Sequence, residues 1–454
     1  MTSRVQLPQV RWPGAEPEMD PYNRARLTKS VADLGHHMID SSYKGFPPWC
    51  GPMPLRDLRK MGWNVRAGQL SSPAAILKDS AMRHNISLMA QYCSDRGVSI
   101  APHAKTAMSP NILRRQAELG VYGFTAATLR QARLLQGFGI NRVLFANQLI
   151  DPHGLRWLAE EMRVAPDFEL IPFVDSTEVV DLMTASLRRQ GCPRSVPVLI
   201  ELGAEGSRSG CRTTATTLTV ADRIRQSDQL HLIGVAGYEG AIRETEIARR
   251  LKRVDDFLAW MSQITQTLAG RGSFEDQREI IVSAGGSAFF DRVVAAFSPL
   301  QASHSAVIVL RCGSYVTHGI GYYSELSPLD GRADRGDATL LSALEVWGEV
   351  LSVPETRMAV VGVGKRDLSY DFSLPRALRA YRRDSSESVD LDADCVTTGV
   401  YDHHLIMSTD STRLGVGDLV SFRTSHPCAD FEKWRLVFVV DDDYRITDGL
   451  LTYF

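Results

Sequence analysis

Residues 195–203 read SVPVLIELG, a continuous apolar run that contains valine and isoleucine and ends at a glycine. Because its apolar residues follow one another rather than alternate with polar ones, this run predicts a β-strand buried on both faces. Seven similar runs occur along the middle of the chain, at residues 98–106, 121–128, 142–150, 168–176, 231–240, 279–287 and 305–316. Strands of this kind are typical of parallel sheets that helices cover on both sides.

Amphipathic segments separate these strands. The clearest spans about residues 243–268, where apolar residues recur at three- and four-residue steps. Ser72 and Pro73 are predicted to open another helix before the first strand, and this helix carries Ile76, Leu77, Met82, Ile86, Met89 and Ala90. Eight strands separated by helices, within about 250 residues, predict an α/β fold of the (β/α)8 TIM-barrel type. A doubly wound sheet is the alternative, but no G-x-G-x-x-G motif follows the first strand.

The pattern changes from about residue 335 onward. Further strands are predicted at residues 357–364, 416–424, 433–441 and 444–454, with little helical periodicity between them. We therefore predict a barrel over residues 66–330 and an all-β domain over residues 331–454. Residues 1–65 are rich in proline and are either an arm or a part of the β domain.

The composition excludes several classes of protein. The 454 residues are enough for two or three domains, and the formal net charge of −2 gives no sign of nucleic-acid or anionic-membrane binding. Seven scattered cysteines without a C-x-x-C pair argue against a disulfide framework or a zinc finger. No secretory signal is recognisable, and no window reaches the roughly 18 apolar residues of a membrane span. We expect a cytoplasmic protein.

Polar residues gather where the predicted strands end. The active site of such a barrel lies at the C-terminal ends of its strands, and polar groups there cost desolvation energy unless they face solvent or a ligand. We therefore expect them to converge on one site. In chain order they are His103, Lys105, Thr125, Asn147, Asp175, Glu201 through Arg208, Tyr238, Glu239, Gly285 to Ser287, and Gly313 to Tyr315.

Lys105 is the first candidate for chemistry. A solvated loop lysine is the ordinary interpretation of such a residue. At a barrel mouth, however, partial desolvation lowers the pKa of a lysine and makes its amine a nucleophile or a base. His103, two residues earlier, should share the same side of an extended chain. The alternative for His103 is a core histidine bonded to the backbone.

Residues 283–291, SAGGSAFFD, place Gly285, Gly286 and Ser287 in a turn before a helix. Backbone N–H groups in such a turn can cradle an anion, although an ordinary tight turn fits the same residues. The last two strands of a barrel are the usual position for a phosphate. A lysine nucleophile and a phosphate cradle in one barrel mouth suggest pyridoxal phosphate as the cofactor.

Residues 425–434, SHPCADFEKW, form the other concentrated stretch. In an extended segment, His426 and Cys428 would present an imidazole and a thiolate on one side. A buried thiol beside an incidental histidine is the alternative. Two protein ligands leave coordination positions open, which suits a catalytic Lewis acid better than a structural metal.

These motifs resemble a known family. In chain order PHAKT, ELGAEGSRSG, GVAGYEG, SAGGS, RCGSYV and SHPCADFEKW are similar to the D-serine dehydratase / D-threonine aldolase group. GKRDLSYDFSLP, residues 364–375, is similar to the bacterial amino acid deaminase branch of this group. The resemblance runs from about residue 70 to the C-terminus. It implies a fold-type III pyridoxal enzyme with an alanine-racemase-like barrel, a β domain and a homodimeric assembly.

The resemblance also implies residue roles. Lys105 corresponds to the lysine that binds the cofactor covalently and acts as catalytic base, and Tyr238 to a catalytic tyrosine. His426 and Cys428 correspond to a metal pair, for which zinc is the expected ion. Dehydratases of the group carry the cysteine, whereas the aldolases usually carry aspartate. The residues expected at the cofactor are Lys105, His103, Arg208, Tyr238, Gly285, Gly286, Ser287, Gly313, Ser314 and Tyr315.

Two segments depart from the family pattern. His318 and Gly319 stand where the family tends to have an acidic residue. Asp402-His403-His404 stands where Asp-Gln-His is expected. Both departures bear on the choice of substrate.

The expected reaction is the elimination of water from a D-configured β-hydroxy amino acid such as D-serine, which gives a 2-oxo acid and ammonia. Retro-aldol cleavage of a D-3-hydroxy amino acid is an alternative. Cys428 favours dehydration, because a softer ligand favours zinc over manganese. A non-catalytic carrier of pyridoxal phosphate is an alternative of another class, and it leaves the His-Pro-Cys segment without a purpose.

Overall fold

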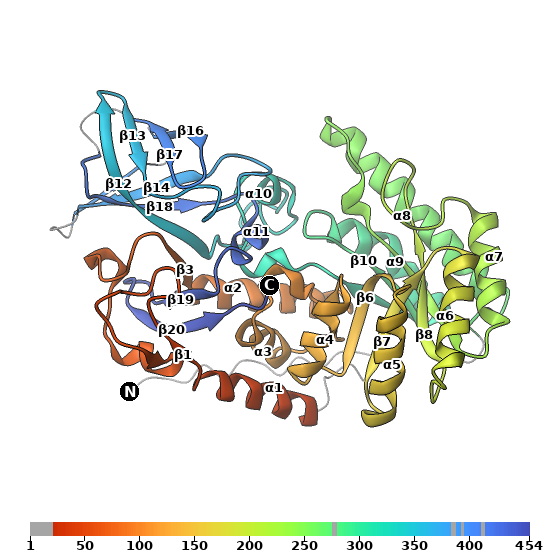
Figure 1. Ribbon diagram of the computed structural model, residues 1–454. Coiled ribbons are helices and arrows are strands. Elements are labelled where there is room, and N and C mark those ends of the chain that lie inside the picture. The colour runs from red at the N-terminus through yellow and green to blue at the C-terminus, as the bar shows by residue number, and fades with distance from the viewer. Residues whose placement is uncertain (1–20, 275–278, 383–386, 392–394, 410–413) are drawn as a thin grey trace. The chain divides into compact units, whose positions relative to one another are not determined.

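The computed structural model describes residues 21–274, 279–382, 387–391, 395–409 and 414–454 (Figure 1). Contacts divide the chain into two compact units, each made of segments that are far apart in sequence. Of the described residues, the first unit comprises 21–27, Ala90–Lys105 and Gln116–Gly313. The second comprises Thr28–Met89, Thr106–Arg115 and Ser314–Phe454.

The first unit contains an eight-stranded parallel sheet in the order β4-β11-β10-β9-β8-β7-β6-β5. A bridge between His103 and Thr125 joins the segment after β4 to β5, and Tyr122 N donates to Ile100 O at 2.8 Å, so the ring of strands closes. All eight predicted strands are confirmed, and with them the (β/α)8 barrel. The strands are β4 (Ser99–Ile100), β5 (Phe124–Ala126), β6 (Arg142–Gln148), β7 (Glu169–Val174), β8 (Val196–Leu202), β9 (Leu230–Gly237), β10 (Ile280–Ala284) and β11 (Ala306–Leu310).

Helices alternate with these strands and lie outside them (Figure 1). The helix predicted at residues 243–268 is confirmed as α8, in which Val254, Leu258 and Met261 are fully buried, whereas Ile247 at its start is exposed. Several helices begin with a side chain that accepts a backbone N–H of the first turn, as Thr128 and Ser176 do. The helices are α4 (Leu129–Gly137), α5 (Pro152–Val164), α6 (Thr177–Arg189), α7 (Thr214–Arg225), α8 (Ile247–Gly270) and α9 (Phe290–His304).

The second unit is built on a ten-stranded sheet. Its main path runs β15-β14-β18-β12-β13-β17-β16, and β3 pairs with both β12 and β19. The four strands predicted from the sequence correspond to β13, β18, β19 and β20, which confirms the all-β domain. The strands are β3 (Ala74–Lys78), β12 (Leu344–Glu355), β13 (Met358–Val361), β14 (Arg376–Tyr381), β15 (Ser388–Asp390), β16 (Val396–Val400), β17 (Leu405–Ser408), β18 (Leu419–Arg423), β19 (Leu436–Val440) and β20 (Ile446–Leu451).

The helix predicted before the first barrel strand is confirmed as α2 (Asp79–Asp95), but its predicted start at Ser72 and Pro73 is wrong. Residues Ala74–Lys78 form strand β3, antiparallel to β12 and parallel to β19, and helix α2 begins only after it. Ile76 and Leu77 are completely buried. So short an apolar run fits either a strand or a helix, and hydrogen bonds to two neighbouring strands decide between them.

The N-terminal part of the described chain contributes to the core of the second unit. Tyr43, Phe46 and Trp63 pack in one cluster with Trp347 and Phe438. The division into units therefore differs from the boundaries expected at residues 66 and 330. Residues 66–89, 106–115 and 314–330 belong to the second unit.

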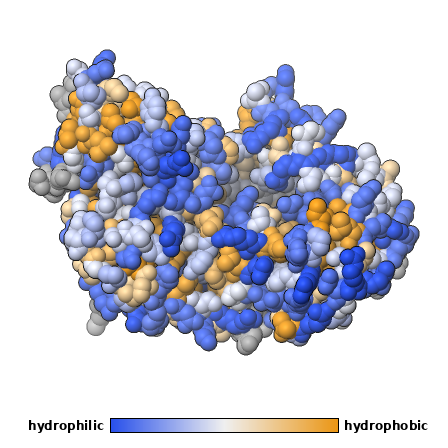
Figure 2. Space-filling view, viewed as in Figure 1, coloured by the Kyte–Doolittle hydropathy of each residue, from blue (hydrophilic) through white to orange (hydrophobic). Residues whose placement is uncertain are grey.

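The visible surface of each unit is mixed. Figure 2 shows hydrophilic side chains over most of it, with small apolar patches between them. All seven cysteines are free thiols. Within the described ranges, the chain has no helix with the length and apolarity to cross a bilayer.

Candidate active site

Lys105 and His103 lie directly after strand β4. Lys105 is in a turn of 3-10 helix, Ala104–Thr106, and its side chain is exposed. His103 has a buried Nδ1 atom that finds no hydrogen-bond partner among the described residues. Burial, and next the charge of Lys105, hold the pKa of His103 well below its usual value, so the imidazole is neutral. An unpaired, buried nitrogen at a strand end is open to a ligand.

The Gly285-Gly286 turn, Tyr238 and Arg208 come together as predicted. Gly285 has a φ of +92°, which favours glycine. A Cβ atom on Gly286 would lie 2.7 Å from Cε2 of Tyr238, so the absence of a side chain lets the turn pack against that ring. The guanidinium carbon of Arg208 lies 4.7 Å from the centroid of the same ring, within cation–π distance.

Glu239 was predicted only as one of the polar residues that converge at the strand ends, with no role of its own. Its side chain is fully buried, and its carboxylate accepts hydrogen bonds from Gly285 N at 3.1 Å and from Gly286 N at 2.6 Å. Burial raises the pKa of Glu239 against the effect of these bonds. The two N–H groups that were predicted to hold a phosphate thus bind a carboxylate of the chain itself. The phosphate cradle stays a prediction, and a phosphate at this turn would use other donors or move Glu239.

Arg311 is a buried charged residue of the barrel that the sequence interpretation missed. It donates from Nη1 to Ser283 Oγ at 2.8 Å and from Nη2 to Gly237 O at 2.5 Å. Burial lowers the pKa of Arg311, and the charge of Glu239 opposes this. Its place directly after an apolar strand, in the motif RCGSYV, was the available signal.

Other polar residues at the strand ends bond to the barrel itself. Thr125 Oγ1 donates to Ala101 O at 2.7 Å, and Asp175 accepts from Gly210 N at 2.9 Å. Glu201 accepts from Gln148 Nε2 at 2.6 Å. These contacts give the three residues a structural role.

His426 and Cys428 lie in the second unit, at the start of α11 (Pro427–Phe431). Their side chains share a hydrogen bond. Cys428 Sγ also lies 3.5 Å from Thr106 Oγ1, to which it donates. Thr106 directly follows Lys105 in the sequence. The predicted metal pair is therefore brought together in the structure.

Asp371 and Phe372 also contact the imidazole of His426. Nδ1 of His426 lies 2.5 Å from Asp371 Oδ2, and the ring stacks on Phe372 with centroids 4.6 Å apart. Burial lowers the pKa of His426, but the hydrogen bonds to Cys428 and Asp371 outweigh it and raise the pKa to about 9. Both neighbours belong to the segment GKRDLSYDFSLP, to which no role was assigned from the sequence.

The segment around His318 explains one departure from the family pattern. A Cβ atom on Gly319 would lie 2.8 Å from Ser425 O, so an acidic side chain does not fit there. His318 has an acidic partner from elsewhere in the chain, Asp330, whose Oδ2 atom lies 2.7 Å from His318 Nε2. Gly313, Ser314 and Tyr315 were all expected at the cofactor. Gly313 is the last residue of the first unit, whereas Ser314 and Tyr315 belong to the second unit and are buried.

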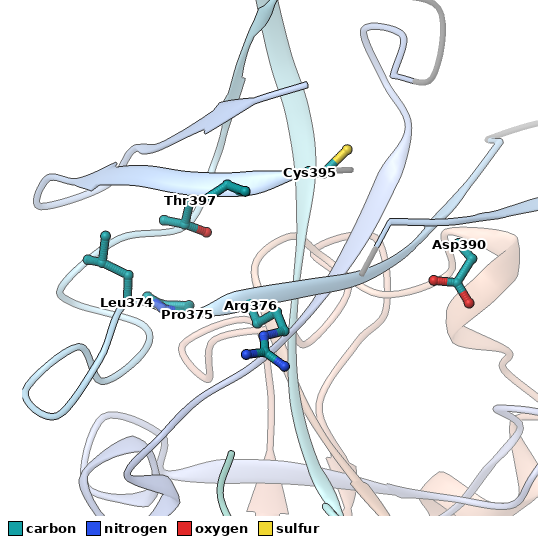
Figure 3. A pocket seen from close by; sticks show the side chains of 7 residues that line it. Leu374, Pro375, Arg376, Asp390, Cys395 and Thr397 are labelled. Atoms are coloured by element: carbon teal, nitrogen blue, oxygen red, sulfur yellow. The ribbon is translucent and has the colours of Figure 1, made fainter. Parts of the chain in front are cut away.

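Two hollows in the second unit lie apart from these residues. One, of about 550 Å³, is lined by the start of β14 and by β16, including Arg376 and Thr397 (Figure 3). The other, of about 750 Å³, is lined by Lys44, Glu349 and the two histidines of the second departure, His403 and His404. Neither lining includes a residue predicted to bind the cofactor or the metal.

The side chains fit both groups that the sequence suggested. In the first unit, an amine, an unpaired imidazole nitrogen and a tyrosine flanked by an arginine suit pyridoxal phosphate. In the second, the imidazole of His426 and the thiol of Cys428 are ligands that zinc takes. The described part of the chain has no group of three or more His, Cys, Asp or Glu arranged around a metal position. A metal at this pair would complete its coordination with water or substrate.

Two sequence models of known protein domains match the chain. A sequence model of the alanine racemase N-terminal domain matches residues 78–288, and one described as "Putative serine dehydratase domain" matches residues 343–440. These two matches make the chain similar, in both of its parts, to the D-serine dehydratase / D-threonine aldolase family. Members of this family are pyridoxal-phosphate-dependent lyases.

Named relatives in the family include dehydratases and aldolases. The chain is 31% identical over 184 residues to D-threo-3-hydroxyaspartate dehydratase from Delftia sp., which is 40% of this chain and 47% of the relative. It is 24% identical over 312 residues to 3-hydroxy-D-aspartate aldolase from Paracoccus denitrificans, 68% of this chain and 75% of the relative. The match thus spans about half of the dehydratase and three quarters of the aldolase.

The fold of a solved family member agrees as well. The structure of D-threonine aldolase from Filomicrobium marinum has a TM-score of 0.69, with 20% sequence identity over 86% of this chain and 96% of that one. At this identity the likeness establishes the shared fold.

Proposed function

We propose that this protein is a pyridoxal-phosphate- and metal-dependent dehydratase. It removes water from a D-configured β-hydroxy amino acid such as D-serine and releases a 2-oxo acid and ammonia. One observation carries the proposal: Cys428, next to His426, hydrogen-bonds Thr106, the residue joined by a peptide bond to Lys105. Consecutive Cα atoms are about 3.8 Å apart. Thr106 therefore connects Cys428 and Lys105. Its side chain accepts a hydrogen bond from the proposed metal ligand Cys428, and its backbone is bonded to that of Lys105.

The residues of the first unit would bind the cofactor and move a proton. Pyridoxal phosphate, bound through Lys105, would supply an electron sink for the negative charge that develops at the substrate Cα. Lys105 Nζ takes the Cα proton as general base. The neutral His103 offers its Nδ1 as a hydrogen-bonding atom at the same strand end. Arg208 holds the ring of Tyr238 in place through its position above it.

The pair in the second unit would serve the leaving group. A divalent metal held by His426 and Cys428 would supply a Lewis acid for the β-hydroxyl, which is a poor leaving group by itself. We propose zinc, because a thiolate and an imidazole suit it. Solved structures of the Delftia dehydratase include a histidine-to-alanine mutant and, two positions later, a cysteine-to-alanine mutant described as metal-free. This spacing is the spacing of His426 and Cys428, and it supports the pair.

Two variants test the proposal. Lys105→Ala should lose both the absorption of the bound cofactor and the release of oxo acid from D-serine. Cys428→Ala should keep the cofactor absorption but lose zinc and dehydration. An active Lys105→Ala protein would contradict the role of the lysine. Full activity of Cys428→Ala in the presence of a chelator would contradict the role of the metal.

Retro-aldol cleavage is the second candidate, because two of the curated relatives are named aldolases. The same lysine and metal ligands would serve it, with the base taking the β-hydroxyl proton instead of the Cα proton. The test is a panel of D-serine, D-threonine and D-threo-3-hydroxyaspartate with their L-forms. Ammonia with oxo acid identifies dehydration, and glycine with aldehyde identifies retro-aldol cleavage.

We also propose a homodimer in the cytoplasm. The seven free thiols fit a reducing compartment. Light scattering should then give twice the chain mass of 50.3 kDa. Cell fractionation should recover the protein with cytosolic markers.

A further inference from the structure

We propose that Asp371 and Phe372 are positioning residues that orient the imidazole of His426, so that its Nε2 is the atom presented to a metal ion. This inference rests on the proposed metal-dependent function and assigns a role to two residues outside the predicted site. The two are adjacent in sequence and contact the same ring from different sides.

Asp371 fixes the edge of the ring. Its Oδ2 atom lies 2.5 Å from His426 Nδ1, and because an ionised carboxylate only accepts hydrogen bonds, Nδ1 must carry the hydrogen. In the neutral tautomer that this bond selects, the lone pair is on Nε2. Histidines that bind metals generally donate their other ring N–H to a carboxylate or a carbonyl, which orients the ring and increases its basicity. Asp371 makes this contact.

Phe372 fixes the face of the ring. The two rings are nearly parallel, with an interplanar angle of 16° and centroids 4.6 Å apart. The side chain of His426 is 25% exposed, so burial alone leaves the ring some freedom to turn. A hydrogen bond at the edge and a stacked ring on the face together restrict rotation about the Cβ–Cγ bond.

The segment that carries Asp371 is itself anchored on both sides. Ser369 N donates to Asp430 Oδ1 at 2.5 Å, and Ser373 N donates to Ser425 Oγ at 3.0 Å. Ser369 and Ser373 flank Asp371, and Asp430 and Ser425 flank His426. The two segments therefore keep a fixed register at the point where the carboxylate meets the imidazole, and such support is what a preorganised ligand requires.

Metal binding by the full-length protein tests the inference. Metal is removed with a chelator, and zinc affinity is then measured by competition with a chromophoric chelator. The absorption of a cobalt(II)–thiolate bond reports ligation by Cys428 independently of turnover. The variants are Asp371→Asn, Asp371→Glu and Phe372→Leu. Asp402→Asn is the matched control, since Asp402 is an exposed carboxylate of the same unit that pairs with Arg366 at 3.4 Å.

We expect Asp371→Asn to bind zinc about 10- to 100-fold more weakly than the wild type. Phe372→Leu should lose less affinity, Asp371→Glu should retain more than Asp371→Asn, and Asp402→Asn should bind like the wild type. Asp371 is half exposed, so its variants should fold, which circular dichroism checks. Phe372→Leu provides a second, independent measure if Asp371→Asn does not fold.

The outcomes separate this inference from the proposed function. A wild-type protein that binds neither zinc nor cobalt overturns the metal-dependent function itself. If the wild type binds zinc tightly and both Asp371→Asn and Phe372→Leu bind it with the affinity of the wild type, the positioning role is wrong. The assignment of His426 and Cys428 as metal ligands then still stands.

Discussion

Replacing Glu239 by alanine removes the acceptor of two backbone N–H groups in the barrel. The N–H of Gly285 is buried and that of Gly286 is partly buried, and each loses its partner. A buried N–H group without a hydrogen-bond acceptor lowers the free energy of unfolding by about 1–3 kcal/mol. Arg311 also loses a nearby negative charge. The raised pKa of Glu239 shows that burying the carboxylate has a cost of its own, which the substitution relieves. We therefore expect a net loss of about 2–4 kcal/mol in the free energy of unfolding.

Glu239→Gln separates the shape of the side chain from its charge. The amide oxygen still accepts one of the two N–H groups, so we expect a smaller loss, about 1–2 kcal/mol. The pH dependence changes too. Folding raises the pKa of Glu239, so the folded chain binds this proton more tightly, and wild-type stability falls as the pH rises through 4.5 towards the folded pKa. Glu239→Gln should lack this dependence.

Urea unfolding followed by circular dichroism at several pH values measures both effects. Glu205→Ala, at an exposed position in the loop after β8, is the matched control and should unfold like the wild type. If Glu239→Ala stays within about 0.5 kcal/mol of the wild type, the range of an ordinary surface substitution, the hydrogen bonds to the glycine turn do not stabilise the barrel.

Three further substitutions test other parts of the structure. His103→Gln should reduce the loss of stability that begins as the pH falls below 6.5, because folding lowers the pKa of His103 and the unfolded wild type binds that proton first. An unchanged acid limb in the denaturation profile would contradict this. Gly286→Ala should lower the free energy of unfolding in urea by about 1–3 kcal/mol, because the added Cβ atom meets the ring of Tyr238. Gly270→Ala is the control and should cost nothing, since no atom lies within 4 Å of its Cβ position. Equal stabilities of the two variants would refute the close packing of the turn. Lys78→Met should cost about 3–5 kcal/mol, because it leaves the fully buried Glu345 without its cation at 3.1 Å, and a melting temperature equal to that of the wild type would argue against the pairing of β3 with β12.

The fold could be predicted from the sequence wherever the apolar pattern of a segment fits only one type of buried secondary structure. The barrel strands are continuous apolar runs, and α8 has an uninterrupted stripe, so local pattern and tertiary environment agree. They disagree at Ala74–Lys78, where an apolar run of five residues was assigned to a helix that begins after it. The partners of this strand lie near the far end of the chain, and no local pattern reveals them.

The candidate site divides in the same way. Lys105, Tyr238, His426 and Cys428 could be proposed because they stand at strand ends or at close spacing, and their roles stay predictions. Glu239 was taken for one of many polar residues, because its hydrogen bonds run to a turn 46 residues later. Asp371 lies 55 residues before His426. Contacts over such separations depend on the fold, and the sequence of either segment alone does not contain them.

The position of β3 has a consequence for the synthesis of the protein. This strand ends at Lys78 and hydrogen-bonds β12, which begins at Leu344. At roughly 5–20 residues per second, a ribosome needs on the order of 13 to 53 seconds to make the intervening chain. Throughout that interval, neither β12 nor β19 has been synthesised, so both edges of β3 lack their hydrogen-bonding partners. We expect a nascent chain stalled before residue 344 to be protected from proteases over the barrel strands and to be cleaved, or bound by a chaperone, around residues 74–78.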